Sequence, residues 1–199
     1  DSDAYSIIST TNLLKKFSRN KNYKIEQKSI LDEEFIRKVK KFDVVYSWGV
    51  LHHTGEMWKA LENCSLKVKK KGKLVLAIYN DQGGASKRWH LIKKIYVSSP
   101  KIIKFFLVAF FFLYFEIRSF LIKLLRFQNP FPFDDWKNKK KNRGMSVIHD
   151  LIDWIGGYPF EYSKPEKIFI FLKKKGFILD NLKTNSGGHG CNEYVFTKN

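Results

Sequence analysis

Hydrophobic and polar positions alternate between two kinds of segment over residues 1–96. Residues 42–48 and 74–79 are almost continuously apolar and rich in β-branched and aromatic side chains, which predicts strands covered on both faces. Residues 56–69 instead carry apolar side chains at helical spacing, which predicts an amphipathic helix. Continuous apolar strands joined by helices are typical of a parallel sheet with helical crossovers, so this part of the chain is predicted to be α/β.

Shorter patterns predict further elements in the same part of the chain. Residues 6–17 have a loosely helical spacing, and residues 23–26 are expected to form a short strand. Asp32 is predicted to cap a helix that runs to about Lys40. Residues 71–72 are expected to turn the chain.

The last part of the chain returns to the pattern of the first. Residues 164–175 predict a helix with Pro165 in its first turn and Gly176 as its stop. Residues 177–179 and 194–196 predict two closing strands.

Residues 97–160 interrupt this pattern. They contain an unbroken run of eleven apolar residues, 105–115. A membrane-spanning helix needs about twenty apolar residues, so the run is short for a span. The sequence favours a cap helix packed on the core, and leaves open an interfacial helix on a membrane and a transmembrane helix. We therefore expect a partial Rossmann-like core in residues 1–96, a helical insertion on the substrate side in 97–160, and a return to the core in 161–199.

The charge balance is strongly basic but has several interpretations. Among 199 residues there are 37 Lys and Arg against 19 Asp and Glu, a formal charge of +18. Only six of the basic residues are Arg, whose planar fork suits phosphate and guanine, so a nucleic-acid partner is not expected. Solvated lysine-rich faces are the preferred interpretation, and an anionic membrane or substrate is the second.

Two further features of composition limit the class of protein. A hydrophobic content of 44% excludes a disordered chain. Cys64 and Cys191 are too few for a disulfide framework, which indicates a reducing compartment and a cytoplasmic location. No cysteine or histidine spacing suggests a metal site.

Polar and small residues follow the two predicted strands of the first half. Residues 47–53 end the first of these strands, and residues 80–83 follow the second. In open parallel sheets, ligands bind beyond the carboxyl ends of the strands. The candidate site is therefore predicted at this edge of the sheet.

The run FDVVYSWGVLHH at residues 42–53, followed by a helix and by KKGKLVL at 70–76, resembles the class I S-adenosylmethionine-dependent methyltransferases. Within them it is most similar to the small-molecule, ubiquinone-biosynthesis-like O-methyltransferases. Residues 143–161 and 190–193 contain segments similar to one subgroup of that branch. The resemblance covers nearly the whole chain and implies a Rossmann-like sheet with a helical insertion before its last two strands.

The same resemblance implies that the sheet lacks its first strand. The glycine-rich loop that follows this strand in the family has no counterpart here, and Asp1 falls where the family has the acidic residue that ends its second strand. Gly187, Gly188 and Gly190 do not replace that loop, because they lie between the final two strands. We therefore expect the chain to be truncated at its N-terminal side.

The resemblance also implies the residues that hold S-adenosylmethionine. Asp1 would accept hydrogen bonds from the ribose hydroxyls, and Asp32 would bind the adenine amino group with Ile30 and Leu31 beside the ring. Each aspartate has an alternative role as a helix N-cap, although Asp3 suits that role better than Asp1. The remaining implied cofactor contacts are Ser47, Trp48 and Gly49.

Methyl transfer is an in-line displacement, so catalysis consists mainly of positioning, with a base only if the acceptor must lose a proton. The candidate base is His53, which resemblance places near substrate. A second candidate is His149 with Asp153, four positions on, and the alternative for that pair is a helix-surface or helix-cap contact. The expected substrate-binding residues are His52, Asn80 and Tyr158, and Glu161 was the further candidate for the acceptor pocket.

The sequence thus predicts methyl transfer to a small, lipophilic acceptor. A peripheral membrane contact through residues 102–125 is expected from the apolar run and its flanking lysines. The alternative function is that of a non-catalytic Rossmann-like remnant that binds an anionic surface or membrane.

Overall fold

A mixed sheet forms the centre of one of the two units into which the chain divides. The computed structural model describes residues 1–19, 22–185 and 190–199. The sheet unit comprises residues 1–81 and 161–199, and the helical unit comprises residues 82–160. The predicted Gly187-Gly188 turn lies outside the described residues, and the predicted three-part domain division stays a prediction.

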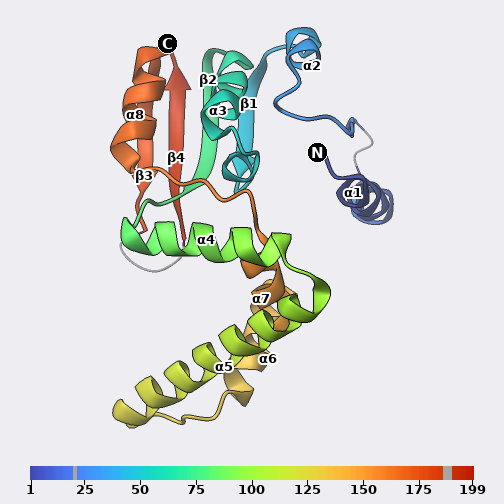
Figure 1. The fold of residues 1–199 in the computed structure, drawn as a ribbon. Helices are drawn as coiled ribbons and strands as arrows, with labels where there is room; N and C mark the ends of the chain where they lie inside the picture. Colours follow the sequence, from blue (N-terminus) through green and yellow to red (C-terminus); the bar gives the residue numbers. More distant parts are fainter. Residues whose placement is uncertain (20–21, 186–189) are drawn as a thin grey trace. The chain divides into compact units, whose positions relative to one another are not determined.

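Within the described residues, four strands lie in the order β1-β2-β4-β3 (Figure 1). They are β1 (Phe42–Trp48), β2 (Val68–Tyr79), β3 (Phe177–Lys183) and β4 (Cys191–Lys198). β1 and β2 are parallel, as predicted, whereas β4 is antiparallel to both of its neighbours. The α/β class predicted from the sequence is confirmed, with a mixed sheet in place of a parallel one.

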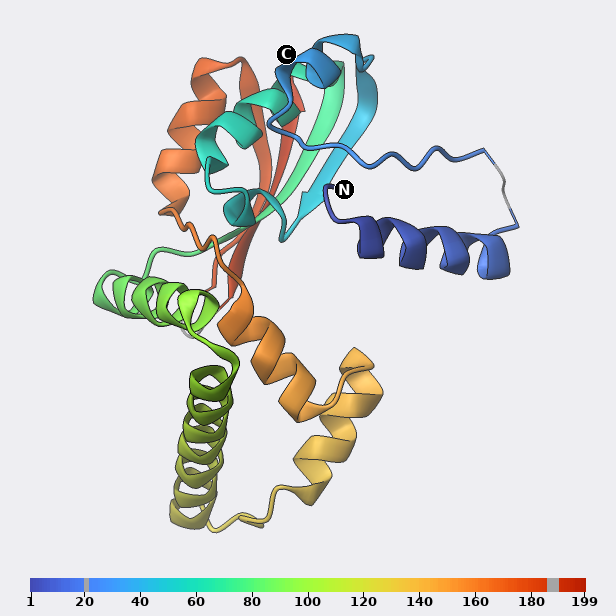
Figure 2. The same ribbon diagram turned by 45° about the vertical axis from the view of Figure 1, so that its right-hand side comes forward.

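Two helices cover one face of this sheet. α3 (Met57–Leu66) and α8 (Pro165–Lys174) lie on the same side of the strands (Figure 2). Their apolar residues form one core with inward side chains of the strands, among them the fully buried Leu76 and Phe196. Alternate side chains of β4 are buried, because successive side chains of a strand point to opposite faces and the helices cover one of these faces.

The opposite face of β1 is exposed, so the expectation that this strand is covered on both faces is wrong. Phe42, Val44, Tyr46 and Trp48 alternate along the strand and are 41–66% exposed. The reason is that β1 is an edge strand and that α3 and α8 pack on one face only. An exposed apolar edge strand is a template for pairing with other chains.

A lysine on this exposed face is expected to improve solubility. Val44→Lys places a charge on the free edge of β1 and so opposes strand pairing between copies. Its soluble fraction after ultracentrifugation should exceed that of the wild type by about twofold or more. The matched control is Ile170→Lys on α8, where the side chain is similarly exposed at 51% but helical backbone cannot add a strand. Equal gains in both variants would show that added charge alone is responsible.

The predicted turn at residues 71–72 is instead an irregularity within β2. Between Phe42 and Val44 of β1, the partner in β2 shifts from Val68 to Lys73. Lys71 has a φ of 62°, and a Cβ on Gly72 would lie 2.9 Å from the carbonyl oxygen of Asp43. The strand therefore continues through a bulge that requires glycine, rather than ending there.

The N-terminal elements of the sheet unit follow the predicted helices but not the predicted strand. α1 (Ala4–Phe17) and α2 (Glu33–Lys38) are helical, and a short 3₁₀ turn spans Leu51–His53. All residues of α1 are exposed or half-buried, and the helix lies apart from the sheet in both ribbon views (Figure 1; Figure 2). Residues 23–26 form no strand, because Lys24 and Glu26 alternate with only two apolar residues and the segment does not pair with the sheet.

The helical unit contains α4 (Gly84–Ser98), α5 (Lys101–Leu125), α6 (Phe133–Arg143) and α7 (Val147–Gly156). Its core forms where Phe111 of α5 meets Leu151 and Ile155 of α7, with Trp89 and Trp154 packed against them. α5 is 25 residues long because the helix continues past Glu116 and Arg118, which end the apolar run in the sequence. By length and composition α5 is sufficient to cross a membrane, which corrects the expectation that this segment is too short.

Candidate functional site

The end of β1 presents backbone to open space. Gly49 follows the strand with a φ of +74°, and its N–H donates to the carbonyl of Ala77 on β2 at 3.2 Å. A Cβ built on Gly49 meets no atom within 4 Å, so a ligand can approach the backbone here. Ser47 is buried beneath this point, whereas Trp48 is 44% exposed and stacks on Tyr46 with ring centroids 5.8 Å apart.

A histidine pair lies beside the end of β2. The ring of His52 is buried against Tyr79, with centroids 4.1 Å apart, and its Nδ1 accepts a long hydrogen bond of 3.4 Å from the Tyr79 N–H. His53 is half-buried, and its ring lies edge-on to Tyr79 at 5.6 Å. An Nδ1 that accepts a hydrogen bond places the hydrogen of a neutral His52 on Nε2. Because His52 is buried and His53 is only half-buried, His53 is the more accessible of the two rings.

Glu161 joins this region to α3. Its N–H donates to the carbonyl oxygen of His52 at 2.9 Å, and its Oε2 accepts from the N–H of Met57 at 2.9 Å. A carboxylate at the first turn of a helix is favoured by the helix dipole. The structure thus gives Glu161 a supporting role at α3, and its contact with the acceptor stays a prediction.

Asn80, predicted to bind substrate, belongs to a network of amide side chains. Its Oδ1 accepts from Nδ2 of the fully buried Asn192 at 3.1 Å, and its Nδ2 donates to the carbonyl of Asn185 at 3.1 Å. Asn192 in turn accepts from the Asn185 N–H at 2.9 Å. These bonds hold the Asn80 side chain at the end of β2. Sequence reasoning missed Asn192, whose only signal is an amide between the apolar positions of β4.

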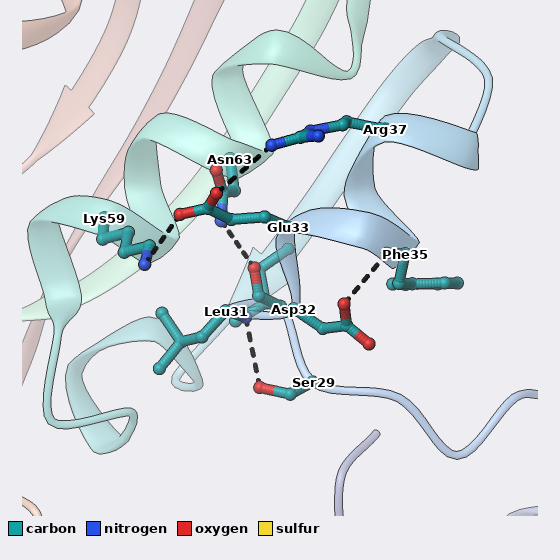
Figure 3. Close-up of polar contacts among 9 residues, drawn as sticks. Ser29, Leu31, Asp32, Glu33, Phe35, Arg37, Lys59 and Asn63 are labelled. Atoms are coloured by element: carbon teal, nitrogen blue, oxygen red, sulfur yellow. Dashed lines mark hydrogen bonds and ion pairs between the residues drawn. The ribbon is translucent and has the colours of Figure 1, made fainter.

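Asp32 forms the predicted N-cap of α2. Its Oδ1 accepts from the Phe35 N–H at 3.0 Å (Figure 3), which confirms the capping role. Asp32 and Phe35 also line a cavity of about 660 Å³. The other residues around this cavity are mostly charged: Lys24, Glu26, Lys28, Glu34, Lys38 and Lys40. Adenine binding by Asp32 stays a prediction.

Ile30 and Leu31 connect this loop to α3. The carbonyl of Ile30 accepts from Asn63 Nδ2 at 2.8 Å, and both apolar side chains pack against the sheet core. Glu33 also reaches α3 through an ion pair of 3.0 Å with Lys59, and this hydrogen-bonded cation lowers the pKa of the exposed Glu33 carboxyl. Asn63 and Lys59 therefore fix the loop that carries Asp32, although no local sequence pattern indicates either contact.

Of the two aspartates at the start of the chain, Asp3 takes the capping role considered from the sequence. Asp3 caps α1, with its Oδ2 accepting from the Ser6 N–H at 2.7 Å. Hydrogen bonds from the Ser6 hydroxyl and from the Ser6 N–H lower the pKa of the Asp3 carboxyl. Asp1 accepts from the Asp3 N–H at 3.0 Å through one carboxylate oxygen. The preference for Asp3 as the cap is confirmed, and ribose binding by Asp1 stays a prediction.

The candidate pair in the helical unit does not form. Within the part of the chain that the structure describes, the His149 ring bonds through Nδ1 to the Ser146 hydroxyl at 2.7 Å rather than to Asp153. The same hydroxyl accepts from the His149 N–H and caps α7. A histidine in the first turn of a helix lies next to the N-cap, which favours this contact over one four residues ahead. His149 thus has the helix-end role that was its alternative.

Tyr158 also lies in the helical unit. Its ring is edge-on to that of His90, with centroids 5.6 Å apart, and the His90 Nδ1 bonds to the carbonyl of Phe160 at 2.8 Å. The sheet unit itself therefore brings together Ser47, Trp48, Gly49, His52, His53 and Asn80 at the ends of β1 and β2.

Comparison with known proteins gives a structural likeness alone. No family model and no curated protein matches the sequence. PKMT2 from Rickettsia typhi, solved in complex with AdoHcy, matches with a TM-score of 0.59 and 11% identity, over 100% of this chain and 43% of that one. An O-methyltransferase family protein from Burkholderia thailandensis matches with a TM-score of 0.51 and 10% identity, over 96% and 40%.

The chain thus spans about two fifths of the length of these solved structures. Their likeness includes the sheet that carries Gly49 and the histidine pair, and one of them holds AdoHcy. The chain has the Rossmann-like α/β fold of these methyltransferases, as the sequence predicted.

Proposed function

We propose that the chain belongs to an enzyme that transfers a methyl group from S-adenosylmethionine to a small, lipophilic molecule. The observation that carries the proposal is the fold shared with an O-methyltransferase family protein and with an AdoHcy-bound protein. The run at residues 42–53 supports it independently, because its resemblance to class I methyltransferases rests on the sequence alone. S-adenosylmethionine supplies a sulfonium-bound methyl group when bound.

The residues at the end of β1 fit such a cofactor. The open space beside Gly49 allows close approach to the backbone, and Ser47 and Trp48 are the neighbouring residues proposed to line the cofactor. Asp32, with Ile30 and Leu31 behind it, is the proposed adenine contact, and Asp1 the proposed ribose contact. The position of β1 at the edge of the described sheet supports the further proposal that an additional strand completes this sheet in the whole protein.

His53 is the base that this geometry supports best. It is half-buried beside the fixed ring of His52 and next to Tyr79, so its orientation is restrained while part of it faces solvent. A restrained, accessible imidazole can take a proton from an acceptor near neutral pH. The proposed partners are a small-molecule acceptor and, through residues 102–125, a membrane surface. The proposed location is the cytoplasm, at the membrane periphery.

Gly49→Val is expected to weaken S-adenosylmethionine binding by tenfold or more. The added side chain would fill the open space beside the backbone, and tenfold corresponds to a loss of about 1.4 kcal/mol. Binding is measured by calorimetric titration of S-adenosylmethionine into the protein expressed from its complete reading frame.

The matched control is Gly144→Val at the end of α6. Gly144 has nearly the same φ, +72°, and the same open surroundings, so both variants suffer the same backbone strain of about 1–2 kcal/mol. Only Gly49→Val should lose affinity. Undiminished binding by Gly49→Val would place the cofactor elsewhere, and no binding by the folded wild type would favour the non-catalytic remnant.

A further inference from the structure

The exposed side of α5 is a continuous apolar stripe. It consists of six residues three or four positions apart, each at least 51% exposed. Residues at this spacing lie on one face of a helix, and these extend over about 27 Å. We call them the exposed stripe: Phe106, Phe110, Leu113, Ile117, Leu121 and Leu124.

The charged residues of α5 lie outside this stripe. At about 100° per residue, Lys104, Glu116, Arg118 and Lys123 all fall beyond the arc that the stripe occupies. Glu116 is engaged there by the Trp136 indole N–H at 3.1 Å, and Lys123 forms an ion pair with Asp135. The apolar face is therefore unbroken by charge and flanked by it, which is typical of helices that bind lipid interfaces.

The other side of α5 is anchored in the helical unit. Phe111 packs on Trp89 with ring centroids 5.3 Å apart, and Phe115 packs on Trp154 at 6.4 Å. α5 therefore packs on the helical unit along one side, where Phe111 is buried, and exposes much of its remaining apolar surface. A helix surrounded by lipid would have no such protein contacts along one side.

The charge of the helical unit selects between a membrane and a second copy of the chain. Residues 82–160 contain 14 Lys and Arg against 5 Asp and Glu, a formal charge of +9. Two copies would repel one another across such a surface, whereas anionic lipid attracts it by about 1 kcal/mol for each basic residue near the headgroups. The charge therefore favours anionic lipid as the occupant of the stripe.

The neighbours of α5 oppose a transmembrane position. Lys93 of α4 and Asp150 of α7 belong to the helices packed on its buried side, and each would be carried towards the hydrocarbon if α5 crossed the bilayer. Ionisable side chains at that depth are costly. We infer that the helical unit docks on anionic membranes with α5 in the plane of the interface and the exposed stripe inserted among the lipids. This inference deepens the proposed membrane contact of residues 102–125 and does not rest on the proposed methyl transfer.

Vesicle flotation tests this docking. The protein should float with vesicles of phosphatidylglycerol and phosphatidylcholine at about 0.1 M salt, and much less with phosphatidylcholine alone. Phe106→Glu with Phe110→Glu should reduce the bound fraction about tenfold or more, since both charges would enter the apolar layer. The control, Ile170→Glu with Ile178→Glu, changes two similarly exposed residues of the sheet unit and should bind as the wild type does.

The remaining outcomes separate the alternatives. Alkaline carbonate should release the protein, and retention would overturn in-plane docking in favour of a span. Equal flotation of the wild type and the α5 variant, or equal binding to neutral vesicles, would overturn the inference. Self-association that the α5 variant abolishes, without vesicle binding, would assign the stripe to a second copy. Calorimetric binding of S-adenosylmethionine is a separate readout, so failure of one proposal leaves the other intact.

Discussion

Phe196→Ala is expected to destabilise the sheet unit by about 3–5 kcal/mol, the usual cost of removing a buried aromatic ring. Phe196 is fully buried on β4, which pairs with strands on both sides, and its ring stacks on Tyr194 with centroids 6.0 Å apart. The ring contributes to the single core between the sheet and its two helices. No local adjustment of one element can fill the resulting cavity, because the core residues come from every strand of the sheet and from both helices.

The rate at which the Cys64 thiol is labelled measures this loss of stability, because Cys64 lies in the same core. It is 5% exposed, and burial raises the pKa of its thiol to about 12, so it reacts slowly until the unit opens. In a Cys191→Ser background, the rate of Cys64 labelling should rise by about a hundredfold or more in Phe196→Ala, because opening becomes easier by the same free energy. Ile178→Ala is the control, since Ile178 is 53% exposed on the neighbouring β3 and should change the rate by less than about tenfold. Similar rates in both variants would contradict the importance of this core.

The elements that the sequence predicted well are those with strong local patterns. The apolar run at 42–48 became β1 with the same ends, and Asp32 capped α2 as its position before the apolar spacing indicated. Residues 71–72 were misread because a lysine-glycine pair signals a turn, whereas the bulge depends on register against β1. The exposed face of β1 was unpredictable for a similar reason: an apolar run describes the strand and not what covers it.

The position of the candidate residues at strand ends was predictable, but their supporting contacts were not. Ser47, Gly49 and the histidine pair lie at strand ends, which follows from the order of strands and helices. The contacts from Glu161 to Met57 and from Asn192 to Asn80 join residues 104 and 112 positions apart, so no local pattern reveals them. His149 and Asp153 met the helical spacing rule, but a hydroxyl at the N-cap was the nearer partner.

Lys93 is expected to make the stability of the helical unit depend on pH. Its side chain is 1% exposed, its Nζ donates to the carbonyl of Trp154, and the ammonium lies over the Trp154 ring at 4.4 Å and the Phe160 ring at 5.0 Å. Burial lowers the pKa of Lys93 to about 8 from its ordinary value of 10.5, and the Asp153 carboxylate offsets only part of this effect. The carbonyl and the rings stabilise the cation without replacing its hydration.

The direction of the change in stability with pH depends on whether the folded or the unfolded chain binds the Lys93 proton more tightly. Between about pH 8 and 10.5 the unfolded chain keeps the Lys93 proton that the folded chain has released, so the free energy of unfolding rises with pH in this window. The gap between the two pKa values corresponds to about 3 kcal/mol. Lys93→Met removes the titrating group and its burial cost. The free energy of unfolding of the variant minus that of the wild type should therefore be larger at about pH 7 than at about pH 10.5. The difference between the two pH values should be about 3 kcal/mol.

Denaturant unfolding followed by tryptophan fluorescence measures the difference, because Trp89 and Trp154 lie in the core of this unit. Lys94→Met is the matched control: it removes one positive charge from the adjacent, exposed position of α4 and should keep a constant difference from wild type at every pH. A constant difference for Lys93→Met as well would mean that the buried amine keeps its ordinary affinity for the proton. The aromatic enclosure would then stabilise the cation as well as water does, and Lys93 would be a permanent positive charge within the core that holds α5.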